Sequence, residues 1–120
     1  VNKLCSSFGK VMPLSESYFP LFCSIAGCAP AYAYMFIDSL ARSAVKNGMN
    51  KSVALEIAAQ TVLGSAKKIL ESDEHPWELI DKVCSPGGTT IEGIVSLQKD
   101  GFESAVCNAV DAALQKDKKV

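Results

Sequence analysis

The sequence predicts an all-α fold of about five to six helices that interlocks with a second copy of itself. Nowhere in the 120 residues do apolar and polar positions alternate for long enough to indicate a β-strand. Apolar residues instead recur every three to four positions, which is the spacing of a helix face. Prolines and glycines separate these stretches, as they do where helices begin and end. With 48% hydrophobic residues, the chain is expected to fold as one domain with a modest core.

The N-terminal third predicts one or two helices. Residues 1–9 are a candidate for the sixth helix, and residues 10–14 read as an extended link. Ser15 can cap a helix over residues 16–27, because its hydroxyl can accept a backbone N–H of the first turn. Pro20 lies inside this segment and predicts either a kink or a late helix start.

Two longer helices are predicted next. A helix over residues 30–48 is predicted to follow a flexible turn and to begin at Pro30. Proline suits the first position of a helix, and a glycine such as Gly48 suits its end. Asn50 is the expected N-cap of a helix over residues 49–72. That helix is apolar on nearly every side, so it is either central in one chain or shared between two. Five helices of this length cannot surround it, which favours an obligate dimer.

Three shorter segments complete the prediction. Residues 75–84 form a helix with Pro76 at its first position, residues 90–101 form a short helix, and residues 102–120 form the last. The apolar positions of the last segment recur at helical spacing and form one stripe. These helices are therefore expected to pack with one face inward.

The segment SPGGTTIEG, residues 85–93, joins two of these helices. Thr89 is followed three residues later by Glu92, the spacing of a capping box in which each side chain accepts a backbone N–H. Gly87 and Gly88 come directly before it and carry no side chain to cover the N–H groups of the helix start. The positive end of the helix dipole is thus expected to be open at this point.

Two interpretations of this segment remain open from spacing alone. Ser85 and Thr90 add hydroxyls to the bare N–H groups, and together they suit a carboxylate or a phosphate. A glycine-rich turn before a capped helix is also an ordinary helix–helix connection that needs no ligand. The chain has neither a P-loop lysine here nor a G-x-G-x-x-G motif after a strand, so it carries no dinucleotide fingerprint of its own.

Charge and cysteine content exclude several other functions. A formal net charge of −1 argues against nucleic acid or an acidic membrane surface as partner. No apolar run is long enough to span a bilayer. The five cysteines follow no zinc or redox spacing, and His75 is the one histidine, so no metal site is expected. Reduced thiols indicate a cytoplasmic protein.

Three blocks of the sequence resemble the C-terminal part of pyrroline-5-carboxylate reductase. The blocks are GCAPAYAYMFIDSLARSAVKNGM, ALEIAAQTVLGSAKKIL and EHPWELIDKVCSPGGTTIEGI. The resemblance runs in register and without a gap from about Ser15 to Leu114. It implies a helical dimerisation and substrate-loop domain over residues 15–120. Residues 1–14 would then end the connection from an N-terminal Rossmann domain that this chain lacks.

The resemblance also implies a function. Enzymes of this family make L-proline by transferring a hydride from NADPH or NADH to the C=N carbon of 1-pyrroline-5-carboxylate. Their dimers interlock through this domain, and in many members they assemble into decamers. Ser85 and the backbone N–H groups of Gly88, Thr89 and Thr90 would hold the substrate carboxylate, in a substrate-binding loop that includes Gly87. Thr90 would also bind substrate, and its hydroxyl would act as a catalytic group near the ring nitrogen.

One turn departs from the family pattern. Where the family has SGSGPAY, this chain has Cys28 in place of a serine and Ala29 in place of a glycine, followed by Pro30. These three residues would lie near the nicotinamide. A chain without a dinucleotide-binding domain cannot place that ring, so the fragment alone is expected to be inactive. The alternative is a non-catalytic, stand-alone helical dimerisation module.

Overall fold

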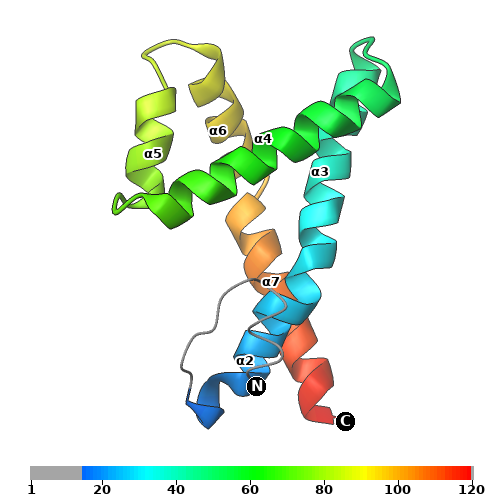
Figure 1. Cartoon of the computed structure of the whole chain (residues 1–120), viewed down its shortest axis with the longest axis vertical. Coiled ribbons are helices and arrows are strands. Elements are labelled where there is room, and N and C mark those ends of the chain that lie inside the picture. Colours follow the sequence, from blue (N-terminus) through cyan, green and yellow to red (C-terminus); the bar gives the residue numbers. More distant parts are fainter. Residues whose placement is uncertain (1–14, 120) are drawn as a thin grey trace.

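The computed structural model describes the backbone of residues 15–119, and within that range every regular element is helical. The predicted all-α fold is confirmed, and the expected helix at 1–9 and link at 10–14 lie outside the described residues. Five helical stretches follow one another (Figure 1). The first stretch joins four elements, a 3-10 turn η1 (Glu16–Tyr18), α2 (Phe19–Cys23), a π-helical turn η2 (Ser24–Cys28) and α3 (Ala29–Lys46). The other four stretches are α4 (Lys51–Glu71), α5 (Pro76–Val83), α6 (Thr89–Lys99) and α7 (Phe102–Lys119).

The first stretch is one uninterrupted helical run from Glu16 to Lys46. The predicted break between residues 27 and 30 is wrong. The Ala29 N–H donates to Ser24 O, five residues back, which makes a wider π-helical turn directly before Pro30. A proline inside an α-helix lacks a donor and clashes with the carbonyl four residues earlier, and the wider turn relieves this conflict.

This continuity also corrects the membrane expectation. The run Glu16–Lys46 has 31 residues and is long and apolar enough to cross a bilayer by length and composition alone. The sequence-based expectation failed because it divided this run at Gly27 and Pro30. A helix that other helices cover on most sides has the same apolar composition.

Helices α3 and α4 cross near the turn that joins them (Figure 1). Gly48 in this turn has a φ of 105°, a conformation that L side chains rarely adopt. Asn50 caps α4 as predicted, with its Oδ1 accepting the backbone N–H of Ser52 at 3.0 Å. Asp38 on α3 forms an ion pair across the corner with Lys51 Nζ of α4 at 2.8 Å and a second one within α3 with Arg42 Nε at 2.6 Å. Hydrogen bonds from Lys51 and then Arg42 hold the pKa of Asp38 below its ordinary value of 3.8.

The last helix returns to the start of the described chain. Helix α7 lies beside α2 and the π-turn, on the side of the molecule away from α5 (Figure 1). Two side-chain contacts connect it to α3. The rings of Phe36 and Phe102 lie 6.0 Å apart, and the Tyr32 hydroxyl donates to Ala109 O at 3.5 Å.

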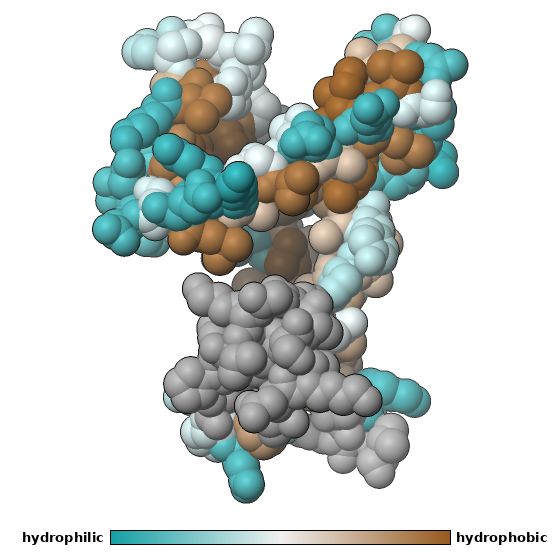
Figure 2. All heavy atoms as spheres, in the orientation of Figure 1, coloured by the Kyte–Doolittle hydropathy of each residue, from teal (hydrophilic) through white to brown (hydrophobic). Residues whose placement is uncertain are grey.

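A single chain buries very little apolar surface. Among the described residues, the fully buried hydrophobic side chains are those of Ala41, Ala54 and Ala58. The chain exposes 9443 Å², against about 6,300 Å² for a compact monomer of its mass. Its radius of gyration is 16.7 Å, where about 14 Å is expected. Apolar side chains accordingly gather along both flanks of α4 in Figure 2.

Helix α4 shows this incomplete core most clearly. Leu63 and Leu70 are 62% and 77% exposed, although leucine is among the residues most often found inside proteins. Several further large apolar side chains of the helix are exposed as well. They are Val53, Leu55, Ile57 and Ile69. The predicted all-round apolar character of this helix is confirmed, and the chain itself does not cover it.

Candidate functional site

The segment after α5 forms a tight turn. The Gly88 N–H donates to Ser85 O at 3.0 Å, which closes a four-residue β-turn. Pro86 occupies the second position, and Gly87 the third with a φ of 72°. Proline followed by a residue with positive φ is the signature of a type II turn, so Gly87 is required by the backbone conformation. The chain thus reverses abruptly between α5 and α6.

Helix α6 begins directly after this turn, one residue earlier than predicted. Its N-cap is Gly88, with φ −82° and ψ 178°, and no side chain caps it. The predicted capping box of Thr89 and Glu92 is therefore wrong, since Thr89 is already the first helical residue. The closing bond of the turn leaves Gly88 extended at the cap position, where glycine is well tolerated. Glu92 remains in the first turn, where its charge suits the helix dipole.

The start of α6 presents two backbone donors. The N–H groups of Thr89 and Thr90 lie in the first turn, where a helix offers no acceptor of its own. Within residues 15–119 no hydrogen bond from either group is found, whereas the Gly88 N–H is used in the turn. Both threonines and Ser85 are exposed in the single chain. Two N–H groups beside three hydroxyls can hold one carboxylate.

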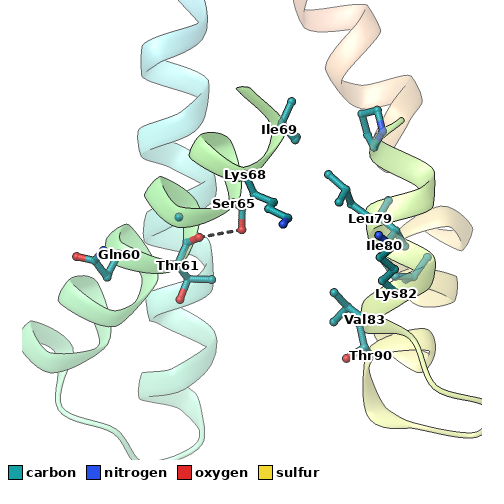
Figure 3. A pocket seen from close by; sticks show the side chains of 13 residues that line it. Gln60, Thr61, Ser65, Lys68, Ile69, Leu79, Ile80, Lys82, Val83 and Thr90 are labelled. Carbon is teal, nitrogen blue, oxygen red and sulfur yellow. Dashed lines mark hydrogen bonds between the residues drawn. The ribbon is translucent and has the colours of Figure 1, made fainter. Parts of the chain in front are cut away.

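An open groove of about 660 Å³ lies between α4 and α5 and ends at Thr90 (Figure 3). In Figure 3 the Thr90 hydroxyl points into the space between the two helices, below Val83. The α5 wall is mainly apolar and includes Leu79 and Ile80, but it also carries Lys82, whose Nζ pairs with Glu74 Oε1 at 2.6 Å. A substrate held at the start of α6 would therefore have an apolar surface on one side.

The opposite wall of the groove belongs to α4 and was missed by sequence reasoning. Its hydroxyls are already used within the helix, because Thr61 donates to Ile57 O and Ser65 to Thr61 O, both at 2.8 Å. Lys68 also lines this wall, and no ion pair to it is found in the described part of the chain. The signal was present in the sequence, since Thr61 and Lys68 are seven residues apart and share one helix face.

The predicted nicotinamide-side residues lie elsewhere in the single chain. Cys28 ends the π-turn and is exposed, while Ala29 and Pro30 are half-buried at the start of α3. Cys28 lines a separate hollow of about 390 Å³ between the π-turn and α7. The structure of one chain thus does not bring these three residues to Thr90 (Figure 1). Among the described residues, no three His, Cys, Asp or Glu side chains cluster as metal ligands.

Comparison with known proteins identifies one family. The family model described as pyrroline-5-carboxylate reductase dimerisation matches residues 16–120. The pyrroline-5-carboxylate reductase of Escherichia coli K12 is 43% identical over 113 residues, which are 94% of this chain and 42% of the relative. The enzyme of the same name from Aquifex aeolicus is 44% identical over all 120 residues, 45% of its length. This chain spans less than half the length of these relatives.

Solved structures agree with the sequence matches. The 1-pyrroline-5-carboxylate reductase of Streptococcus pyogenes superimposes with a TM-score of 0.92 at 44% identity, covering 99% of this chain and 46% of that one. The pyrroline carboxylate reductase of Plasmodium falciparum, solved with NADP bound, gives a TM-score of 0.89 at 38% identity. The superposition covers 98% of this chain and 45% of the Plasmodium falciparum chain.

Proposed function

This chain belongs to the pyrroline-5-carboxylate reductase dimerisation family, and from that premise we propose that it is the dimerisation and substrate-loop domain of a proline-forming reductase. The full protein would reduce 1-pyrroline-5-carboxylate to L-proline with NADPH or NADH in the cytoplasm. The family match over residues 16–120 is the observation that carries the proposal. Residues 1–14 would connect this domain to a dinucleotide-binding domain.

The membership in a dimerisation family implies a homodimer, and the exposed apolar surface supports it. The surplus of about 3,100 Å² over a compact monomer exceeds the roughly 800 Å² that each partner buries in a standard interface. Obligate homodimers often bury this much and more. We propose that the partner covers the apolar flanks of α4 in an interlocked dimer, and that such dimers can assemble further into decamers.

The loop after α5 is the proposed carboxylate site. The donors would be the N–H groups of Thr89 and Thr90 and the Ser85 hydroxyl, because the Gly88 N–H already closes the turn. Hydrogen bonds to a charged group contribute about 1.5–3 kcal/mol each, more than neutral ones. Gly87 and Gly88 serve this site through the turn rather than as donors. The amended role for Gly88 follows directly from its bond to Ser85 O.

Thr90 is the proposed catalytic residue. Its hydroxyl points into the groove, and a substrate carboxylate on its backbone N–H would place the pyrroline ring close to this hydroxyl. During reduction the C=N carbon gains a hydride and the ring nitrogen gains a proton. A hydroxyl beside the nitrogen would orient it and help to deliver that proton.

The described residues fit the edge of a coenzyme site and not the whole of one. Cys28 is exposed beside a hollow, so its thiol can border a flat ring, and the adjoining Pro30 offers no N–H. No residue from 15 to 119 lies in a strand. These residues therefore contain no strand–turn–helix unit that could bind the pyrophosphate of a dinucleotide. When bound, the coenzyme supplies the hydride. The residues that hold its phosphates would come from the proposed dinucleotide-binding domain, so this segment alone is expected to be inactive.

The decisive experiment is an assay of the full-length protein. Oxidation of NADPH and of NADH is followed at 340 nm with 1-pyrroline-5-carboxylate present, and proline is measured as the product. Turnover with either coenzyme supports the proposal. No turnover with both would refute it and leave the alternative, a stand-alone helical dimerisation module without catalysis, which the incomplete core of the single chain also fits.

A further inference from the structure

Ser85 and Gly88 approach each other closely across the turn. A Cβ atom placed on Gly88 would lie 2.4 Å from Ser85 Oγ, a separation that real Cβ atoms essentially never show. The same Cβ would lie 3.2 Å from the Ser85 carbonyl oxygen, which needs an adjustment of only a few tenths of an ångström. The Ser85 hydroxyl therefore occupies the space that a side chain at position 88 would fill.

The backbone gives no other reason for a glycine at position 88. Its φ of −82° and ψ of 178° are extended values that any residue can adopt. Serine, asparagine or aspartate would cap α6 better than glycine, because each brings a side-chain acceptor. By contrast, Gly87 has a φ of 72° and is needed for the turn itself. The two glycines thus have different physical roles.

We propose that Gly88 is a positioning residue that sets where the Ser85 hydroxyl stands. Without a Cβ at position 88, this hydroxyl can lie against Gly88, the N-cap residue of α6 that directly precedes Thr89 and Thr90. A carboxylate on those two groups then receives a third hydrogen bond. That this carboxylate belongs to the substrate rests on the proposed function. The close approach of Ser85 and Gly88 does not depend on it.

The response to a Cβ at position 88 follows from the atoms it meets. Serine has a short side chain with three staggered χ1 positions, so its hydroxyl can rotate away at little cost. The backbone at Gly88 can stay as it is, because alanine tolerates the same φ and ψ. Gly88→Ala is therefore expected to keep the fold and the turn but to remove the hydroxyl from the carboxylate site. It should act like Ser85→Ala.

The test uses four variants of the full-length enzyme. They are Ser85→Ala, Gly88→Ala, the double variant, and the control Gly93→Ala. Gly93 lies on the same helix, and a Cβ there meets no atom within 4 Å. We expect either single change to raise the KM for 1-pyrroline-5-carboxylate roughly tenfold or more. The double variant should equal the singles, and the KM for the coenzyme should stay constant in all four.

Each alternative result has a definite meaning. The inference is overturned if the fold-increase in KM of the double variant equals the product of the two single fold-increases. It is also overturned if Ser85→Ala raises the KM for the substrate and Gly88→Ala leaves it unchanged. If no variant changes the KM for the substrate, the carboxylate role of the loop fails. A crystal structure of the Gly88→Ala protein then decides the remaining point. A Ser85 hydroxyl in its original position overturns the positioning role, and a rotated one supports it.

Discussion

The incomplete core of one chain predicts that the thermal stability of this domain depends on protein concentration. If the folded state is a dimer that unfolds to two separate chains, tenfold dilution lowers its unfolding free energy by about 1.4 kcal/mol. Two chains of 120 residues have an unfolding entropy of about 0.5 kcal/mol/K. The Tm should therefore fall by about 3 °C for each tenfold dilution.

Thermal melts followed by circular dichroism from about 1 to about 100 μM protein would show a total shift of about 6 °C. Light scattering should give twice the 12.8 kDa mass of the chain, or a higher multiple. A Tm that does not change with concentration, together with a monomeric mass, would refute the reasoning.

A pair of variants on α4 adds specificity to this test. Leu63 is 62% exposed in the single chain, and burying a leucine contributes about 1.5–3 kcal/mol. A two-fold dimer contains the residue twice, so Leu63→Glu should weaken association by at least 3–6 kcal/mol, or roughly 10²–10⁴-fold in Kd. The matched control is Lys67→Ala, which changes a charged residue of the same helix and should leave the dimer intact. Equal dimer stability in both variants would contradict the proposed role of α4.

Three further predictions concern single residues. Thr90→Ala in the full-length enzyme should lower kcat by a factor of about 10 to 1000, as expected when one positioned hydrogen bond is lost, and unchanged kinetics would exclude it from the mechanism. His75 Nδ1 accepts the Trp77 N–H at 3.1 Å and caps α5, so His75→Ala should cost about 1 kcal/mol in urea unfolding while His75→Asn keeps the cap. Asp38 has a lowered pKa in the folded state, so its stabilisation is complete above pH 3.8 and is lost as the pH falls through the folded pKa. The stability difference between the native protein and Asp38→Asn should therefore shrink on acidification, and a constant difference would contradict the ion-pair account.

Local signals in the sequence predicted much of the fold. Asn50 caps α4 through its side chain, and Ser15 accepts the Ser17 N–H at 3.3 Å, both as the residue types indicate. The π-turn before Pro30 could not be predicted in this way. Glycine and proline there are typical of a break, and only the continuation of the helix on both sides makes a wider turn the better solution. His75 was overlooked as a cap because histidine is seldom considered for that role.

The loop shows a similar division between local and distant causes. The sequence Pro86-Gly87 was enough to predict a turn, and glycines before a helix were enough to predict open backbone donors. The exact start of the helix was not predictable from the T-x-x-E spacing. The bond from Gly88 to Ser85 O fixes the cap one residue earlier than that spacing suggests. The groove wall on α4 was missed because the shared face of Thr61 and Lys68 is only a faint polar signal on a helix that is apolar nearly all round.

The placement of the loop, unlike its shape, would depend on the proposed dimer. The turn and the first residues of α6 are held by contacts between near neighbours in the sequence, so their shape is complete in one chain. Helices α5 and α6 border α4 across a groove, and α6 packs mainly against α7. A partner that covers α4 would also fix the distance between the two walls of this groove. If the loop binds substrate as proposed, dimerisation and substrate binding are not separate functions, since the surface that completes the core would also determine where Thr90 stands.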